Sequence, residues 1–246
     1  MRTLLLILIA LLPCLALAQP KLGLTVTPLS EQVYVHTTYG IYGNAPVPSN
    51  GLIVKTNDGI VLIDTGWDTV DDTDNTRQLL RWVSDSLRQP VRLCIITHAH
   101  DDKIGGIAEL RKAGIRVIST PLTAQKAVKS GYPSPDPILP SDTTLTIGQE
   151  PIRCYFPGEG HTSDNIVVWL PDKQILYGGC FVKSVAAFGM GNLADANVKA
   201  WSGSIRNVMH QFSNARIVVP GHEEWSDTKA LEHTLQLINK HLAAKK

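Results

Sequence analysis

The pattern of apolar and polar positions predicts strands in the first quarter of the chain and alternating elements after it. Early strands are expected at residues 24–27, 33–37, 52–55 and 60–63. The last two flank Thr56-Asn57-Asp58-Gly59, a sequence that favours a hairpin turn. The following segments predict, in order, a helix at 69–87, a strand at 93–96, a helix at 104–113, a strand at 117–118 and a helix at 122–129.

The second half of the chain repeats this order after a Pro-rich segment, 132–140, which is expected to be a surface loop. Strands are expected at 145–155, 166–170 and 175–177, followed by a helix at 198–212, a strand at 217–219 and a terminal helix. That last helix carries an apolar stripe made of Leu231, Leu235, Ile238 and Leu242. Two facing sheets with helices outside would bury both halves, so we predict a single α/β domain with αββα layers.

The first 18 residues have the layout of a secretory signal peptide. Met1-Arg2-Thr3 is a short positive start, residues 4–12 are all apolar, and Ala16-Leu17-Ala18 is a small-x-small cleavage site. The apolar run is shorter than the roughly 20 residues that span a bilayer. We therefore expect a signal peptide at 1–18, a mature domain at 19–246 and export to the periplasm. Lipidation at Cys14 is the alternative, although Pro13 stands where a small residue is expected.

Composition and charge narrow the possible functions. The chain is 43% hydrophobic and 18% charged, as globular proteins are. Its 23 Lys and Arg against 22 Asp and Glu become 22 against 22 once Arg2 is removed, so no basic surplus favours nucleic acid as a partner. Three cysteines would survive cleavage, so at least one thiol stays unpaired in an oxidising compartment. Metal ligation would explain it, whereas Cys94 and Cys154 lie in apolar strands and are expected to be buried thiols.

Six residues that can bind a metal lie just after predicted strands, usually beside glycine. They are His98, His100, Asp102, His161, Cys180 and His222. Loops at the C-terminal ends of strands converge along one edge of an α/β sheet, where ligands commonly bind. Three histidines with a fourth position open to water make a catalytic zinc site. A carboxylate, a thiolate and an imidazole suit a second zinc better than magnesium or calcium. We therefore expect two Zn²⁺ ions, the first on His98, His100 and His161 and the second on Asp102, Cys180 and His222.

The order of these motifs resembles the metallo-β-lactamases, in particular the subclass with a three-His first zinc and an Asp-Cys-His second zinc. The motifs that carry the resemblance are Thr97-His98-Ala99-His100-Asp101-Asp102, Gly160-His161, Gly178-Gly179-Cys180 and Pro220-Gly221-His222, together with segments 47–51, 160–169 and 191–196. The resemblance implies an αββα sandwich, two zinc ions and hydrolysis of the β-lactam amide of penicillins, cephalosporins and carbapenems, which confers antibiotic resistance.

The resemblance also implies roles for individual residues. Lys183 would bind the substrate carboxylate, and Asn192 would bind the substrate and polarise the lactam carbonyl, acting in catalysis with Asp102. The alternatives are a solvated surface lysine and a turn asparagine. Residues 39–48, with Ile41 and Tyr42, correspond to a flap over the site or to a plain hairpin tip.

Three further positions bear on the site. Asp64 and Trp67 are expected to support and pack around the metals. Glu223 stands where the family often has glycine, which adds negative charge beside the second zinc.

The expected chemistry is attack on the lactam carbonyl by hydroxide, because zinc lowers the pKa of bound water to about 7. Thioesterases and lactonases on the same fold are rivals, but they usually have a histidine and an aspartate where this chain has Lys103 and Cys180. An exported zinc-binding protein without turnover is the other alternative. We expect a monomer whose partner is a small β-lactam, with no stable membrane association after cleavage.

Overall fold

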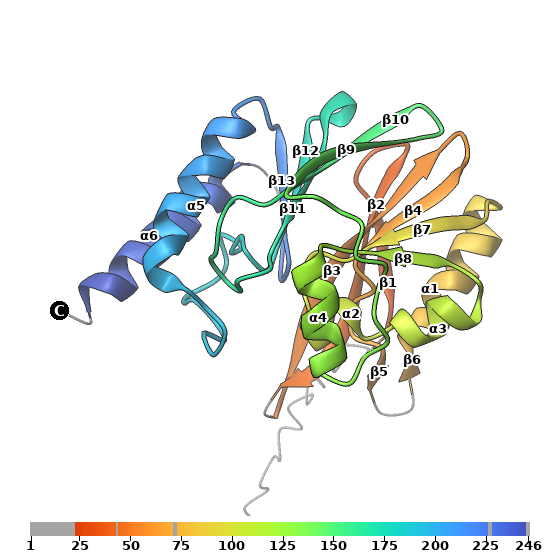
Figure 1. Cartoon of the computed structure of the whole chain (residues 1–246), viewed down its shortest axis with the longest axis horizontal. Coiled ribbons are helices and arrows are strands. Elements are labelled where there is room, and N and C mark those ends of the chain that lie inside the picture. The colour runs from red at the N-terminus through yellow and green to blue at the C-terminus, as the bar shows by residue number, and fades with distance from the viewer. Residues whose placement is uncertain (1–22, 43, 71–72, 226–227, 245–246) are drawn as a thin grey trace, which may run out of the picture.

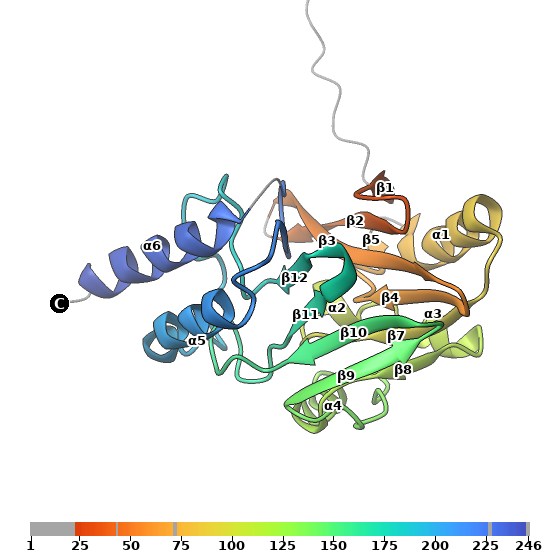
Figure 2. The same cartoon turned by 90° about the horizontal axis from the view of Figure 1, so that it is seen from above.

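Two β-sheets lie face to face, with helices covering the outer face of each (Figures 1 and 2). The computed structural model describes residues 23–42, 44–70, 73–225 and 228–244. Its four layers confirm the αββα arrangement predicted from the repeated order of elements.

The first sheet is built from the N-terminal half of the chain. Its strands, in spatial order, are β1 (Thr25–Pro28), β2 (Val33–Tyr42), β3 (Ala45–Thr56), β4 (Gly59–Ile63), β7 (Val91–Ile95) and β8 (Arg116–Ile118). The strands are antiparallel as far as β4, and β4, β7 and β8 are parallel. The accompanying helices are α1 (Asn75–Trp82), the π-helix η1 (Val83–Leu87), α2 (Asp101–Ile104), α3 (Ile107–Lys112) and α4 (Pro121–Lys129).

The second sheet is built from the C-terminal half. Its strands, in spatial order, are β13 (Ile217–Pro220), β12 (Ile175–Gly179), β11 (Val167–Leu170), β10 (Glu150–Tyr155) and β9 (Asp142–Ile147). A short 3-10 helix, η2 (Pro171–Lys173), joins β11 to β12. Helices α5 (Val198–Gln211) and α6 (Lys229–Ala243), drawn in blue, cover the outer face of this sheet (Figure 1).

Buried apolar side chains fill the spaces between the layers. Val35, Ile63 and Val168 belong to the core between the two sheets, with every one of them fully buried. The predicted stripe of α6 packs inward, because Leu231 and Ile238 are buried while Leu235 and Leu242 pack against the same core. Burial of this stripe against the second sheet is what holds the terminal helix on the domain.

The structure corrects the helix predicted at 69–87. Its first residues instead form two short antiparallel strands, β5 (Thr69–Val70) and β6 (Thr73–Asp74). The helix begins only at Asn75, because the Asp74 carboxylate accepts a hydrogen bond from the backbone N–H of Arg77 and caps it.

The helix predicted at 104–113 is also wrong in detail, since it is divided into α2 and α3 at Gly105 and Gly106. A Cβ on Gly106 would lie 2.1 Å from the Thr76 hydroxyl, so the glycine allows close approach to α1.

Other predictions depend on residues at the N-terminus and on the cysteines. The expected signal peptide and Cys14 lie outside the described residues. Within the part of the chain that is described, no helix is both long and apolar enough to cross a bilayer. Cys94 and Cys154 are buried free thiols, as predicted.

Candidate metal centre

Three histidines from two loops meet at the edge of the sandwich. His98 and His100 follow β7, and His161 follows β10, so strand pairing in two different sheets sets their positions. One ring nitrogen from each lies within 4.8 Å of the others. His100 Nδ1 is 3.1 Å from His161 Nε2, and the three rings meet edge to face. The structure therefore brings together all three residues predicted for the first zinc.

Hydrogen bonds on the far side of two of these rings determine which nitrogen carries the proton. Thr97 Oγ1 donates to Asp64 Oδ2 at 2.8 Å, so it can only accept from His98 Nδ1, 3.2 Å away. This leaves His98 Nε2 unprotonated, and that buried atom has no hydrogen-bond partner among the described residues. His100 Nε2 lies 2.9 Å from an Asp195 carboxylate oxygen, which leaves Nδ1 as the free acceptor. Both free nitrogens have the lone pair that a metal requires.

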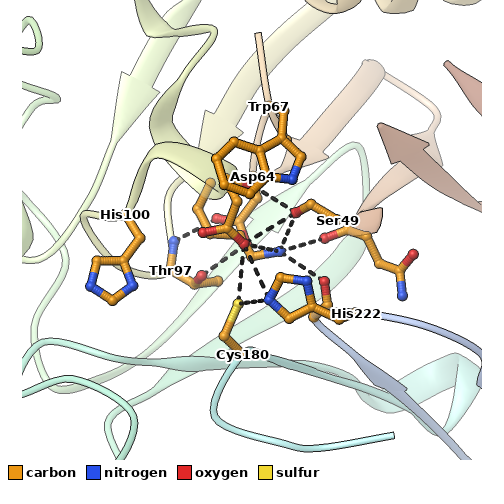
Figure 3. Close-up of polar contacts among 12 residues, drawn as sticks. Ser49, Asp64, Trp67, Thr97, His100, Cys180 and His222 are labelled. Carbon is orange, nitrogen blue, oxygen red and sulfur yellow. Dashed lines mark hydrogen bonds and ion pairs between the residues drawn. The ribbon is translucent and has the colours of Figure 1, made fainter. Parts of the chain in front are cut away.

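Asp102, Cys180 and His222 form a second cluster, and Figure 3 shows the Cys180 sulfur beside the His222 ring. Asp102 Oδ2 is 3.3 Å from Cys180 Sγ and 3.5 Å from His222 Nε2, and the sulfur and nitrogen are 3.2 Å apart. Zinc ligands at about 2.0–2.3 Å and tetrahedral angles lie about 3.3–3.8 Å from one another. The two separations from Asp102 fall in this range and the sulfur–nitrogen one is just short of it, so the three atoms are close enough to share a zinc. His222 Nδ1 faces the Pro48 carbonyl oxygen at 2.6 Å, which leaves Nε2 free for the cluster.

The protonation of these groups also fits metal ligation. Burial lowers the pKa of His98 to about 3 and that of His222 to about 4, so both imidazoles are neutral at neutral pH. Burial would raise the pKa of Asp102, but the charge of the neighbouring Lys103 holds it well below its usual value. Burial and the Asp102 charge raise the pKa of the Cys180 thiol. A thiolate at this position therefore needs a cation beside it, and the soft donor set suits zinc.

A buried lysine ties together the segments that supply the second cluster. Lys103 is fully buried, and its Nζ donates to Ser49 Oγ at 2.7 Å, to the Asn50 carbonyl at 3.0 Å and to the Gly221 carbonyl at 3.1 Å. Its Nζ is also 3.3 Å from Asp102 Oδ2. The lysine thus joins β3, α2 and the loop after β13 around Asp102.

A cavity of about 670 Å³ opens beside both clusters. The β2–β3 hairpin contributes Ile41 and Tyr42 to one wall, with 44% and 62% of their surface exposed. Phe188, fully exposed, lines it from the loop between β12 and α5. Lys183 and Asn192 from the same loop also line the cavity. Metal-binding, charged and apolar groups therefore share one opening.

Comparison with known proteins agrees with this geometry. The model of the Metallo-beta-lactamase superfamily matches residues 44–222, which include both clusters. The chain belongs to the metallo-β-lactamase superfamily. It is 46% identical over 215 residues to "Metallo-beta-lactamase type 2" of Bacillus cereus, covering 87% of this chain and 82% of that protein. It is 37% identical over 247 aligned positions to the protein of the same name from Bacteroides fragilis, covering 98% of each.

Solved structures of metallo-β-lactamases have the same fold. The enzyme from Pontibacter korlensis is 44% identical with a TM-score of 0.84, covering 88% of this chain and 99% of that one. The enzyme FIM-1 from Pseudomonas aeruginosa, solved in a mono-zinc form, is 36% identical with a TM-score of 0.81, covering 89% and 96%. With its two donor clusters, this member of the superfamily fits two zinc ions.

The structure decides against the alternative for Lys183, and for Asn192 it shows both a turn contact and a place in the cavity lining. Lys183 is not a solvated surface lysine, because only 7% of its surface is exposed and its Nζ lies 5.5 Å from the centre of the Trp201 ring. Asn192 does act as a turn residue, because its Oδ1 accepts a hydrogen bond from the Ala194 N–H at 3.0 Å. It also lines the cavity, so the turn does not remove it from the site.

Of the two predicted supporting residues, Asp64 acts on a ligand through another residue and Trp67 lines the cavity itself. Asp64 is buried in a left-handed backbone conformation at φ 61°, and its carboxylate accepts hydrogen bonds from Thr97 N and Oγ1 and from the Tyr177 hydroxyl, each at 2.8 Å. It acts on His98 through Thr97. Trp67 lines the cavity and packs against Gly40, where a Cβ would lie 2.3 Å from the indole.

Sequence reasoning missed several residues that orient the ligands. Thr97 and Asp195 lie inside the motifs that carry the family resemblance, and a search for partners of the histidines could have found them. The carbonyl of Pro48 gives no signal in the sequence, because any residue has a carbonyl. Gly221 packs against the ligand itself, since a Cβ there would lie 2.5 Å from Cys180 N and 2.7 Å from its Sγ.

Proposed function

We propose that this protein is a zinc-dependent β-lactamase that hydrolyses the amide bond of penicillins, cephalosporins and carbapenems. One observation carries the proposal: two adjoining donor clusters suited to zinc line the same cavity as the buried Lys183. The relatives named metallo-beta-lactamases support the same reaction. Resistance to β-lactam antibiotics would follow from it.

Six residues would hold the metal: His98, His100 and His161 for the first zinc, and Asp102, Cys180 and His222 for the second. When bound, zinc supplies Lewis acidity that polarises a carbonyl and ionises water near neutral pH. Each of three histidines donates a hydrogen bond away from the metal position: His98 to Thr97 Oγ1, His100 to the Asp195 carboxylate and His222 to the Pro48 carbonyl. These bonds support the assignments, because each fixes the ligating nitrogen.

The residues of the chain would position the substrate around this centre. The buried Lys183 ammonium would bind the substrate carboxylate, and the Asn192 side-chain amide would donate a hydrogen bond to the lactam carbonyl oxygen. The turn that engages Asn192 Oδ1 supports this role, because it directs the amide NH₂ group away from the turn. The Asp102 carboxylate, ionised because of its low pKa, would accept a hydrogen bond from water and orient it.

The exposed apolar side chains of the cavity have a separate role in the proposed reaction. Ile41 and Tyr42 on the β2–β3 hairpin and Phe188 on the loop between β12 and α5 line the cavity and expose large apolar surfaces. They would contact the substituents of the bound substrate and reduce the access of bulk water to the reacting amide.

Turnover by purified protein tests the proposal. Penicillin, cephalosporin and carbapenem hydrolysis should be measured with a thioester and a lactone as controls, before and after treatment with a chelator. We expect β-lactam hydrolysis that the chelator abolishes and that Zn²⁺, but not Mg²⁺, restores. Preferred turnover of the thioester or the lactone would assign the protein to another hydrolase class. Zinc binding with no turnover would make it a binding protein.

We also propose that the protein is exported to the periplasm as a monomer, with its signal peptide removed. Intact-mass measurement of the periplasmic protein should give a chain that begins at or near Gln19. A lipid-bearing Cys14 would contradict this, and a mass in solution of two subunits would contradict the monomer.

A further inference from the structure

Glu223 occupies an unusual backbone conformation at the wall of the cavity. It follows His222 directly, lines the same cavity as Lys183, and has a φ of 62°. Residues with a side chain are uncommon in this left-handed region, whereas glycine adopts it without steric cost. Strained residues of this kind cluster at functional sites, so the presence of a carboxylate here needs a chemical reason.

The backbone around Glu223 is held in place by one side chain of the first sheet. Asn50 Nδ2 donates to the Glu223 carbonyl at 2.8 Å and to the Pro220 carbonyl at 3.0 Å. The Asn50 N–H donates to the Gly221 carbonyl at 2.9 Å. Because these bonds fix the main chain, they also fix the direction in which the Glu223 side chain leaves it.

The charge of Glu223 acts on the region where the substrate carboxylate is expected. Burial lowers the pKa of Lys183, and the charge of Glu223 is one of the negative charges that counteract this effect. Lys183 is buried, whereas Glu223 is exposed. The cavity thus has a buried cation, Lys183, and an exposed carboxylate, Glu223, nearer the solvent.

This pair of opposite charges matches one kind of substrate. In a cephalosporin, the ring carbon that carries the carboxylate is bonded to the carbon that carries the 3-position substituent. When the substrate carboxylate is bound to Lys183, the 3-position substituent therefore lies within a few ångströms of the lysine. If the substituent is cationic, it completes a second ion pair, and if it is neutral or anionic, Glu223 contributes nothing or repels it.

We propose that Glu223 is a specificity-determining residue that favours β-lactams with a cationic group next to the carboxylate, such as cephalosporins with a pyridinium substituent. This inference rests on the proposed β-lactamase function. An exposed ion pair contributes about 0.2–1 kcal/mol, which corresponds to a preference of up to about fivefold.

The test compares two cephalosporins that share one acyl side chain and differ at the 3-position, one with a pyridiniomethyl group and the other with an acetoxymethyl group. For Glu223→Gln, we expect KM for the pyridinium compound to rise about threefold to fivefold, with KM for the acetoxymethyl compound unchanged or lower. The preference of the wild-type enzyme should weaken at high salt, because the pair is exposed. Glu224→Gln is the matched control, since Glu224 is also exposed but does not line the cavity.

A second variant guards against an effect on folding. Glu223→Gly removes the carboxylate and suits the backbone conformation, so it should show the same change in the ratio of the two KM values. Zinc content should equal that of the wild type in both variants. An equal change in KM for both compounds, or no change, would overturn the role of Glu223 while leaving the β-lactamase function intact. Failure of the wild-type enzyme to hydrolyse either compound would overturn both.

Discussion

The burial of Lys183 leads to a quantitative prediction for the loss of its charge. Only 7% of the surface of Lys183 is exposed, and its backbone N–H donates to Thr234 Oγ1 of α6 at 2.8 Å. The ammonium therefore meets the substrate as a fixed, largely desolvated cation. A surface ion pair is worth about 0.2–1 kcal/mol, whereas a hydrogen bond to a charged group with little solvent competition is worth about 1.5–3 kcal/mol.

We expect Lys183→Met to lower kcat/KM by about 10- to 150-fold, because each 1.36 kcal/mol corresponds to a factor of ten. Methionine retains an unbranched side chain against Trp201, so packing should change little. Most of the loss should appear in KM, because the carboxylate contact is kept from the bound substrate to the transition state.

Steady-state kinetics on one compound of each β-lactam class would measure this effect, with Lys173→Met as the control. Lys173 is also partly buried and forms an ion pair, with Glu150 at 2.7 Å, but it does not line the cavity. A loss of less than threefold would refute the reasoning from burial. So would a fall in kcat at constant KM, because the lysine would then act on the chemical step.

Three other substitutions test the metal centre and the core. Cys180→Ser should leave a folded protein that binds one zinc tightly in place of two and has a lower kcat, whereas the control Cys154→Ser should keep both zinc ions. Native mass spectrometry measures the zinc content, and two tightly bound zinc ions with full turnover in Cys180→Ser would refute the ligand role. Gly221→Ala should weaken binding of the second zinc and lower the free energy of unfolding by about 1–3 kcal/mol, because its Cβ would overlap Cys180. The control Gly203→Ala in α5 places its Cβ in open space and should not destabilise the protein. Equal melting temperatures of the two variants would contradict this. His36 is buried and its pKa is lowered to about 4, so the neutral imidazole contributes stability on the order of 3 kcal/mol that is present above pH 6.5 and is lost as the pH falls to 4. Denaturation of the metal-free His36→Gln variant should therefore show a shallower dependence of the unfolding free energy on pH than the metal-free wild type.

The layered architecture could be predicted from the sequence because it depends on local patterns. The stripe of Leu231, Leu235, Ile238 and Leu242 is a property of one helix, and its burial follows from the spacing alone. The same reasoning failed at 69–87, where apolar periodicity gave no sign that Asp74 would cap the helix and that the preceding residues would pair as strands. Capping and strand pairing depend on hydrogen bonds, which the hydrophobic pattern does not record.

The candidate ligands could also be named from the sequence, because each follows a predicted strand and has suitable donor chemistry. Only the tertiary structure decided how they are held. Cys180 meets Asp102 across 78 positions of sequence, and His222 meets the Pro48 carbonyl across 174. These contacts depend on the register of two sheets and on how the sheets face each other, which no local pattern encodes. The burial of Lys183 is decided in the same way, because its ammonium lies over Trp201 of α5 and its backbone N–H donates to Thr234 of α6, two helices that come later in the chain.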